Sequence, residues 1–124
     1  MRCLRIWADE AGESHLADID IPLAPVEVFP GAPPFRLSAP WRATAVRFVV
    51  HPPGLGEVGW HNPPERQLVV FLTGETEFET SDGAVRRVGP GAVVLAEDTW
   101  GKGHISRHPD EEQRVLHIPV QDAP

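Results

Sequence analysis

The fold is decided by residues 75–97, which read ETEFETSDGAVRRVGPGAVVLAE. In the first six positions glutamate alternates with threonine or phenylalanine, so every glutamate would face water and the residues between them would face a core. The tripeptide SDG at residues 81–83 is typical of a hairpin turn, and GPG at residues 89–91 is a second tight turn. This stretch therefore predicts three consecutive short strands.

The rest of the chain has the same character. Fourteen prolines and eleven glycines among 124 residues interrupt every window that could form a long amphipathic helix. The segment RQLVVFLTG, residues 66–74, is apolar on both faces, so we expect it inside the fold. Further strands are expected at residues 43–51, 103–108 and 114–120. Seven or eight short strands predict an all-β fold, namely a two-sheet, jelly-roll-like β-barrel.

The N-terminal third differs from the remainder in its proline content. We expect residues 1–41 to form an N-terminal strand and an extended proline-rich arm, and residues 42–124 to form the barrel of the same single domain. An edge strand is expected at residues 26–29, because proline is tolerated at sheet edges. The arm is too apolar to lie free in water, so we expect it to pair with a partner barrel in a homodimer.

Composition excludes several classes of partner. The net charge of −7 argues against a nucleic-acid partner, which would require clustered lysine and arginine. The longest apolar run is only five residues, at 68–72, so we expect no membrane span. The N-terminus becomes acidic before a signal-type segment could form, and the single Cys3 cannot form an internal disulfide. We therefore expect a cytoplasmic protein whose partners are a small molecule and a second copy.

Residues 54–108 resemble the two motifs of the cupin family, G-x5-H-x-H-x3,4-E-x6-G and G-x5-P-x-G-x2-H-x3-N. His61 matches the first histidine, and His104 follows Gly101 with the G-x2-H spacing of the second motif. Pro63 stands at the second histidine position and Gln67 at the glutamate position. The segment EDTWGKGH, residues 97–104, also resembles a group of small single-domain bacterial cupins.

The resemblance implies a double-stranded β-helix with a divalent metal inside it. Cupins hold that metal with three histidines and a glutamate, and His61, Gln67 and His104 would be the ligands here. Imidazole suits Fe, Mn, Ni, Cu or Zn. We expect weak binding or none, because Pro63 has no donor atom and Gln67 is neutral.

Three functions remain open from the sequence. The first is a metal-assisted enzyme, dioxygenase-like or lyase-like, acting on a small organic molecule. The second is a metal-free isomerase, dehydratase or cyclase, in which His61 or His104 works with Asp98 or Glu97 as an acid–base pair. The third is a non-catalytic protein that binds a small ligand.

Several further residues are assigned expected positions. The residues expected to contact the ligand are Trp60, Gln67, Phe71, Glu97 and Trp100. His108 is expected at a solvated loop edge, because it begins the polar segment HPDEEQ. His117 is expected to face outward, because it alternates with Leu116 and Ile118, which look like core. His15 and His51 belong to no pattern.

Overall fold

The computed structural model describes residues 1–121, and within that range the chain is all β. The prediction of an all-β protein is confirmed, with more strands than expected. The strands are β1 (Arg2–Ala8), β2 (Ser14–Asp20), β3 (Ala24–Val26), β4 (Phe35–Leu37), β5 (Arg47–His51), β6 (Glu57–His61), β7 (Gln67–Phe71), β8 (Thr76–Thr80), β9 (Val85–Val88), β10 (Val93–Ala96), β11 (His104–Arg107) and β12 (Gln113–Pro119). No helix long and apolar enough to cross a membrane occurs in residues 1–121.

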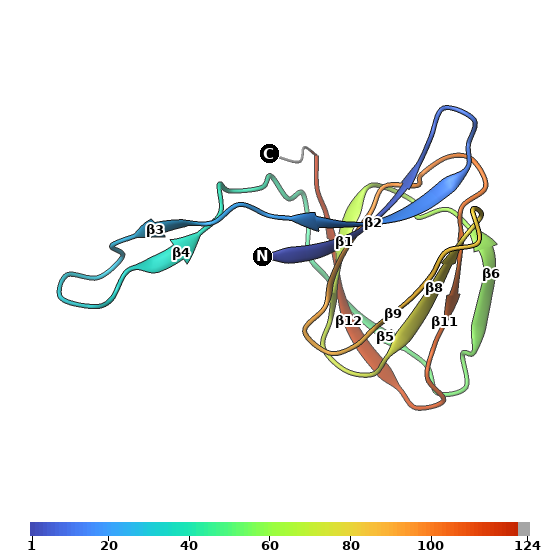
Figure 1. Ribbon diagram of the computed structural model, residues 1–124. Coiled ribbons are helices and arrows are strands. Elements are labelled where there is room, and N and C mark those ends of the chain that lie inside the picture. The colour runs from blue at the N-terminus through green and yellow to red at the C-terminus, as the bar shows by residue number, and fades with distance from the viewer. Residues whose placement is uncertain (122–124) are drawn as a thin grey trace.

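Two main sheets face each other (Figure 1). The larger has the strand order β2-β1-β10-β7-β12-β5 and the smaller has the order β6-β11-β8-β9. Within residues 1–121 hydrogen bonds do not join them into a closed barrel, so the two-sheet part of the prediction is confirmed and closure is not. The core lies between the sheets, where Phe71, Val94 and Val115 of the larger sheet pack with Phe78 of the smaller.

The smaller sheet has one polar and one buried face, as the alternation in residues 75–80 predicts. Thr76, Phe78 and Thr80 are buried. On the outer face Arg107 of β11 forms ion pairs with Glu77 and Glu79 of β8. The hairpin turn between β8 and β9 is confirmed as well.

The larger sheet is apolar on both faces. β7 lies in its interior, as predicted, with Gln67 and Phe71 buried on the inner side. On the outer side Leu68 packs against a small cluster that includes Leu95 and Val120, while Val70 stays partly exposed. Apolar residues thus lie on both faces of β7. The inner face is buried, but the rest of this chain covers only part of the outer face.

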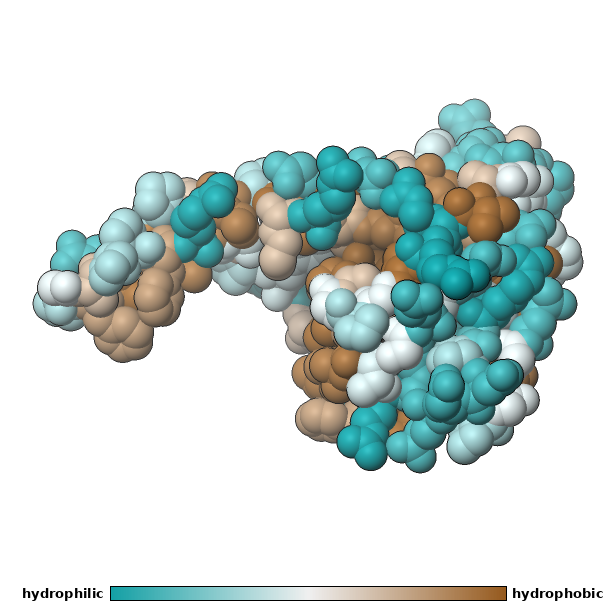
Figure 2. Space-filling model, turned by 60° about the horizontal axis from the view of Figure 1, so that its bottom comes forward, coloured by the Kyte–Doolittle hydropathy of each residue, from teal (hydrophilic) through white to brown (hydrophobic). Residues whose placement is uncertain are grey.

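Strands β3 and β4 form a separate two-stranded hairpin that projects from the rest of the molecule (Figure 1). Every residue of both strands is exposed. The edge strand expected at residues 26–29 occurs slightly earlier, at Ala24–Val26, and pairs with Phe35–Leu37. Hydrophobic surface covers the lower side of the projection and the adjacent side of the body (Figure 2).

Candidate functional site

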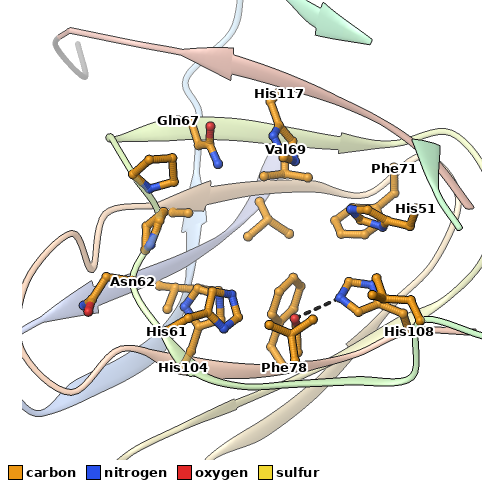
Figure 3. A pocket seen from close by; sticks show the side chains of 18 residues that line it. His51, His61, Asn62, Gln67, Val69, Phe71, Phe78, His104, His108 and His117 are labelled. Carbon is orange, nitrogen blue, oxygen red and sulfur yellow. Dashed lines mark hydrogen bonds between the residues drawn. The ribbon is translucent and has the colours of Figure 1, made fainter. Parts of the chain in front are cut away.

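A cavity of about 290 Å³ lies between the two sheets. Five of the six histidines line it, together with apolar side chains from both sheets and the amide of Gln67. The histidines are His51, His61, His104, His108 and His117. The histidines occupy different ends: His61 and His104 lie together at one end, and His51 and His108 lie at the other, with Phe78 between them (Figure 3). We call His61 and His104 the proximal pair, and His51, His108 and His117 the distal cluster.

The proximal pair is brought together by β6 and β11. His61 and His104 are directly opposite each other in the ladder, and their ring centroids are 4.5 Å apart. A register shift between these strands follows the pair, so His61 and Val58 both reach the cavity although they are three positions apart. Gly103 allows this approach, because it has a φ of 72° and a Cβ there would collide with the backbone of His61.

Both rings of the proximal pair are held by their Nδ1 atoms. His104 Nδ1 lies 2.6 Å from Oδ2 of Asp98, a side chain with 0% exposure. His61 Nδ1 lies 2.6 Å from the carbonyl oxygen of Gly59. An oxygen acceptor at each Nδ1 requires the proton on that nitrogen, so Nε2 is the atom each ring offers to the cavity. Asn62 holds the turn behind the pair by donating to the Asp98 carbonyl oxygen at 2.9 Å.

The distal cluster is organised around Gln113 of β12, which is completely buried. Its Oε1 lies 2.9 Å from His51 Nδ1 and 3.1 Å from His108 Nδ1. His108 Nε2 accepts from the Ser106 hydroxyl at 2.9 Å. Burial lowers the pKa of His108, and it also lowers the pKa of His117, where the neighbouring His51 and Arg47 side chains act in the same direction. Unlike His104, His51 and His108 have a neutral amide as their partner.

Gln67 lines the cavity from β7 and is 5% exposed. Its Oε1 is buried without a hydrogen-bond partner among the described residues. Buried side-chain amides are almost always hydrogen-bonded, because leaving them unpaired is costly. Its unpartnered amide therefore points to a ligand that completes its hydrogen bonds.

A cupin-type metal fits this donor set poorly. His61 and His104 each offer one Nε2, but Pro63 has no donor atom and Gln67 offers only a neutral oxygen. Residues 1–121 contain no group of three or more histidine, cysteine, aspartate or glutamate side chains placed to hold an ion. The third imidazole and the charge-compensating carboxylate are both missing from the residues that would hold the metal.

Three residues expected in the cavity lie elsewhere. Trp60 and Trp100 do not line it; they are 52% and 51% exposed. The register shift that turns His61 inward leaves Trp60 on the outer side of β6. Glu97 is also outside, because its carboxylate is bound by Arg5 and Arg66. Burial raises the pKa of Glu97, but these two partners outweigh that effect and hold it below its usual value.

The remaining expected residues are on or behind the cavity wall. His61, Gln67, Phe71 and His104 line it, and Asp98 contacts the cavity only through His104. Of the two carboxylates left open by the sequence, Asp98 is the one that pairs with a cavity histidine.

Two expectations about the other histidines are wrong. His117 faces the cavity rather than solvent, because Leu116 and Ile118 cover the outer face of the sheet and not the core between the sheets. His108 is half-buried by its contacts with Ser106 and Gln113 rather than solvated. His51 was without any pattern, and only its pairing with Gln113 across β5 and β12 reveals its place.

Comparisons with known proteins give one relevant likeness. No family model matches this chain, and no curated protein matches it. Among solved structures it is similar to the crystal structure of a cupin domain from Bordetella pertussis Tohama I. The two are 23% identical, the match covers 84% of this chain and 99% of that one, and the TM-score is 0.47. That structure bears the name of the family whose motifs residues 54–108 resemble.

Proposed function

We propose that this protein is a small-molecule enzyme that transfers protons within the cavity without needing a metal, as an isomerase, dehydratase or cyclase does. The observation that carries this is the 2.6 Å contact between His104 Nδ1 and the buried Asp98 carboxylate. A carboxylate in this position orients the ring and stabilises the imidazolium that forms when Nε2 accepts a proton. The double-stranded β-helix of the cupins, inferred from the resemblance, would be the framework.

The proximal pair supplies two proton-transfer groups rather than one. With one neutral and one protonated ring, His104 Nε2 removes a proton from a carbon next to a carbonyl group. The C–H electron pair forms a new C=C bond while the C=O π pair moves onto the carbonyl oxygen, which takes the proton from His61 Nε2. The product is the enol. Where the α-carbon carries a hydroxyl group, this enol is an enediol, and an isomerisation is completed when that hydroxyl group gives its proton to one ring and the former carbonyl carbon takes a proton from the other. Paired groups in opposite protonation states are the usual arrangement for such chemistry.

The surroundings suit a substrate of low polarity. Phe71, Phe78 and Val94 form apolar walls between the two ends of the cavity. Apolar walls lower the local dielectric, which strengthens the electrostatic effect of the Asp98–His104 pair on charge that develops in the transition state. The unpartnered Oε1 of Gln67 is available to accept a hydrogen bond from a substrate hydroxyl group.

Proton exchange tests this function directly. Protein dialysed against a chelator is incubated in D2O with a panel of hydroxyketones, including 4-hydroxyacetophenone, and the loss of the proton signals beside the carbonyl is followed by NMR. We expect exchange that survives chelation and falls by roughly 10²–10⁴-fold in His104→Ala. His15→Ala is the matched control, since His15 is a histidine outside the cavity.

Two results would overturn the proposal. Activity that disappears on chelation and returns with a first-row metal would establish the metal-assisted reaction instead. Ligand binding without exchange of any compound in the panel would establish a binding protein.

A further inference from the structure

We infer that the distal cluster is a recognition site for a neutral hydroxyl group on the ligand. This inference rests on the proposed function of the same cavity and specifies its substrate class. It starts from the hydrogen bonds that the cluster already makes. Both nitrogens of His108 are occupied, by Gln113 Oε1 and by the Ser106 hydroxyl. His108 therefore positions its neighbours and does not bind the ligand itself.

The free atoms belong to the other two histidines. His51 uses Nδ1 on Gln113 Oε1 at 2.9 Å, which leaves Nε2 as an unprotonated acceptor. The His117 ring lines the cavity and makes no hydrogen bond within residues 1–121. The ring centroids of His51 and His117 are 6.5 Å apart. Two imidazoles at this separation can share one hydroxyl group, with His51 accepting its proton and His117 donating to its oxygen.

The absence of charged side chains at the distal end of the cavity, within residues 1–121, selects against an ionised group on the ligand. Burial favours neutral His108 and His117, and among residues 1–121 no carboxylate side chain lines the cavity. A carboxylate or an ammonium group would lose its hydration against apolar walls without meeting an opposite charge. A hydroxyl group loses much less and finds both an acceptor and a donor.

The two ends together define the ligand class. The proximal pair requires an acidic C–H beside a carbonyl group, and the distal cluster requires a hydroxyl group. Phe71 and Phe78 pack edge to face with ring centroids 6.1 Å apart, and together they present an apolar wall that suits a flat, apolar segment joining the two polar groups of the ligand. The cavity volume of about 290 Å³ is at the small end of the range for ligand pockets. An uncharged hydroxyaryl ketone meets all these requirements.

Binding of three related probes to the full chain tests this inference. The probes are 4-hydroxyacetophenone, acetophenone, which lacks the hydroxyl, and 4-acetylbenzoate, which carries a carboxylate in its place. Affinities are measured by NMR titration with 15N-labelled histidine. We expect 4-hydroxyacetophenone to bind at least about tenfold more tightly than the other two, because an unmatched hydrogen-bonding site is costly. The side-chain signals of His51 and His117 should shift with it.

Two variants test whether the distal cluster causes the preference for 4-hydroxyacetophenone. His117→Phe should lower the affinity for 4-hydroxyacetophenone to that for acetophenone and leave acetophenone binding unchanged, whereas His15→Phe should alter neither. Equal binding of the three probes, or tightest binding of 4-acetylbenzoate, would overturn the inference. Binding is measured without turnover, so absent proton exchange with this preference intact would defeat only the proposed reaction.

A second and independent inference concerns the outside of the molecule. We propose that two copies associate by placing the projecting β3–β4 hairpin of each on the outer face of the larger sheet of the other. The exposed apolar residues form two groups. On the hairpin they are Val26, Val28, Phe29, Phe35 and Leu37, and on and beside β5 they are Val46, Phe48 and Val50. Phe48 is 85% exposed.

One copy leaves both groups uncovered, because the hairpin projects away from its own body (Figure 1). Phe29, Phe35 and Phe48 alone leave on the order of 300 Å² of ring surface in water. Together with the exposed valines and Leu37 beside them, these rings form apolar surface of the kind that often marks an interaction site. A two-fold arrangement covers both groups at once, since each hairpin meets the other copy's sheet.

The outer faces of the two sheets support this choice of surface. Ion pairs of Arg107 with glutamates cover the smaller sheet, which is suited to water. The outer face of the larger sheet instead carries Val70 and Leu116 beside Phe48, and the edge of β5 is unpaired within residues 1–121. A sheet with two apolar faces is ordinarily covered on both.

Mixing two variants tests the reciprocal arrangement. Sedimentation velocity at micromolar concentration should show a dimer for the wild type and for Val85→Asp, a control on the smaller sheet that is similarly exposed. Phe29→Asp on the hairpin and Phe48→Asp on the sheet should each be monomeric. Their equimolar mixture should dimerise again, because the intact hairpin of one variant meets the intact sheet of the other.

Circular dichroism confirms that each variant is folded, which is expected because both side chains are exposed. A monomeric wild type would overturn the proposal, and so would dimers that survive both substitutions. A mixture that stays monomeric would also overturn it, because that result is expected for a sheet-to-sheet contact in which Phe48 meets its own copy.

Discussion

The two ends of the cavity use the same side chain for different chemistry. At the proximal end His104 is hydrogen-bonded to the buried carboxylate of Asp98. At the distal end His51 and His108 are hydrogen-bonded to the neutral amide of Gln113. A carboxylate partner favours a ring that takes up a proton, and an amide partner fixes the tautomer without favouring charge. The hydrogen-bond partner of a histidine therefore indicates the role of that histidine better than its position in the cavity does.

The largest effect on the rate of proton exchange is expected when the charge of Asp98, which distinguishes the proximal end from the distal end, is removed. Asp98→Asn keeps the size of the side chain but removes the charge that stabilises imidazolium at His104. We expect proton exchange to fall by roughly 10²–10⁴-fold, with ligand affinity nearly unchanged. Steady-state rates and the NMR titration measure the two quantities separately. Full activity in this variant would mean that His104 does not act through Asp98.

The second prediction contrasts the two buried glutamines. Gln113→Leu would leave Thr76, His51 and His108 without their shared partner, and we expect it to lower the free energy of unfolding by about 1–3 kcal/mol. Gln67→Leu removes an amide that has no partner and should cost less than about 1 kcal/mol while weakening ligand binding. Urea unfolding followed by tryptophan fluorescence compares them. Equal losses of stability would show that the Gln67 amide is hydrogen-bonded in the folded protein.

The third prediction converts the proximal end into a fuller metal site. Pro63→His combined with Gln67→Glu adds one imidazole and one negative charge beside His61 and His104. We expect affinity for Zn2+ or Ni2+ to rise by at least about tenfold, as measured by competition with a chromophoric chelator. Gln67→Glu alone serves as the control for charge. A wild-type protein that retains a full equivalent of metal through dialysis would contradict the expected weak site.

The smallest expected effect is the pH dependence of stability. Because burial lowers the pKa of His117 below 6.5, the unfolded chain binds more protons than the folded one between the two pKa values. Stability from His117 is thus complete above pH 6.5 and declines as the pH falls through the folded pKa. His117→Gln should flatten this acid-side decline, measured by urea unfolding between about pH 7.5 and pH 5.

His15 provides the opposite case for the same measurement. Its hydrogen bond to Asp9 raises the pKa of His15 above 6.5, outweighing its partial burial. The stability that it contributes is therefore complete below 6.5 and declines as the pH rises through the folded pKa. His15→Gln should flatten the alkaline side and leave the acid side unchanged. A change on the same side for both variants would refute the difference in their environments.

The sequence predicted features that follow from local pattern. The alternation in residues 75–80 gave the correct inner and outer faces of β8, and the glycine at position 83 gave its turn. Alternation also showed correctly that His117 and its neighbours Leu116 and Ile118 lie on opposite faces of β12. It could not show which face meets the cavity, since both faces of that strand carry apolar residues. For this reason His117 was placed on the wrong side.

Other parts of the site depend on pairing between distant residues. The register shift between β6 and β11 separates Trp60 from the cavity, and no local signal marks it. Glu97 is bound outside the cavity by Arg5 of β1 and by Arg66, just before β7, and both arginines are far from Glu97 in the sequence. The distal cluster joins residues 51, 108 and 117, which share no motif, and becomes visible only once β5 and β12 are paired.

The place of β1 in the larger sheet has a consequence for how the chain folds. β1 runs parallel to β10 and pairs Leu4 with Val94 and Ile6 with Ala96, although these partners are 90 residues apart. Leu4 and Ile6 belong to the core, so their burial must wait until residues 93–96 have left the ribosome. Such long-range parallel pairing makes folding slow, because a large loop has to close before the contact forms. β1 can therefore pair with β2 early, but it acquires β10 as its other neighbour only late in folding.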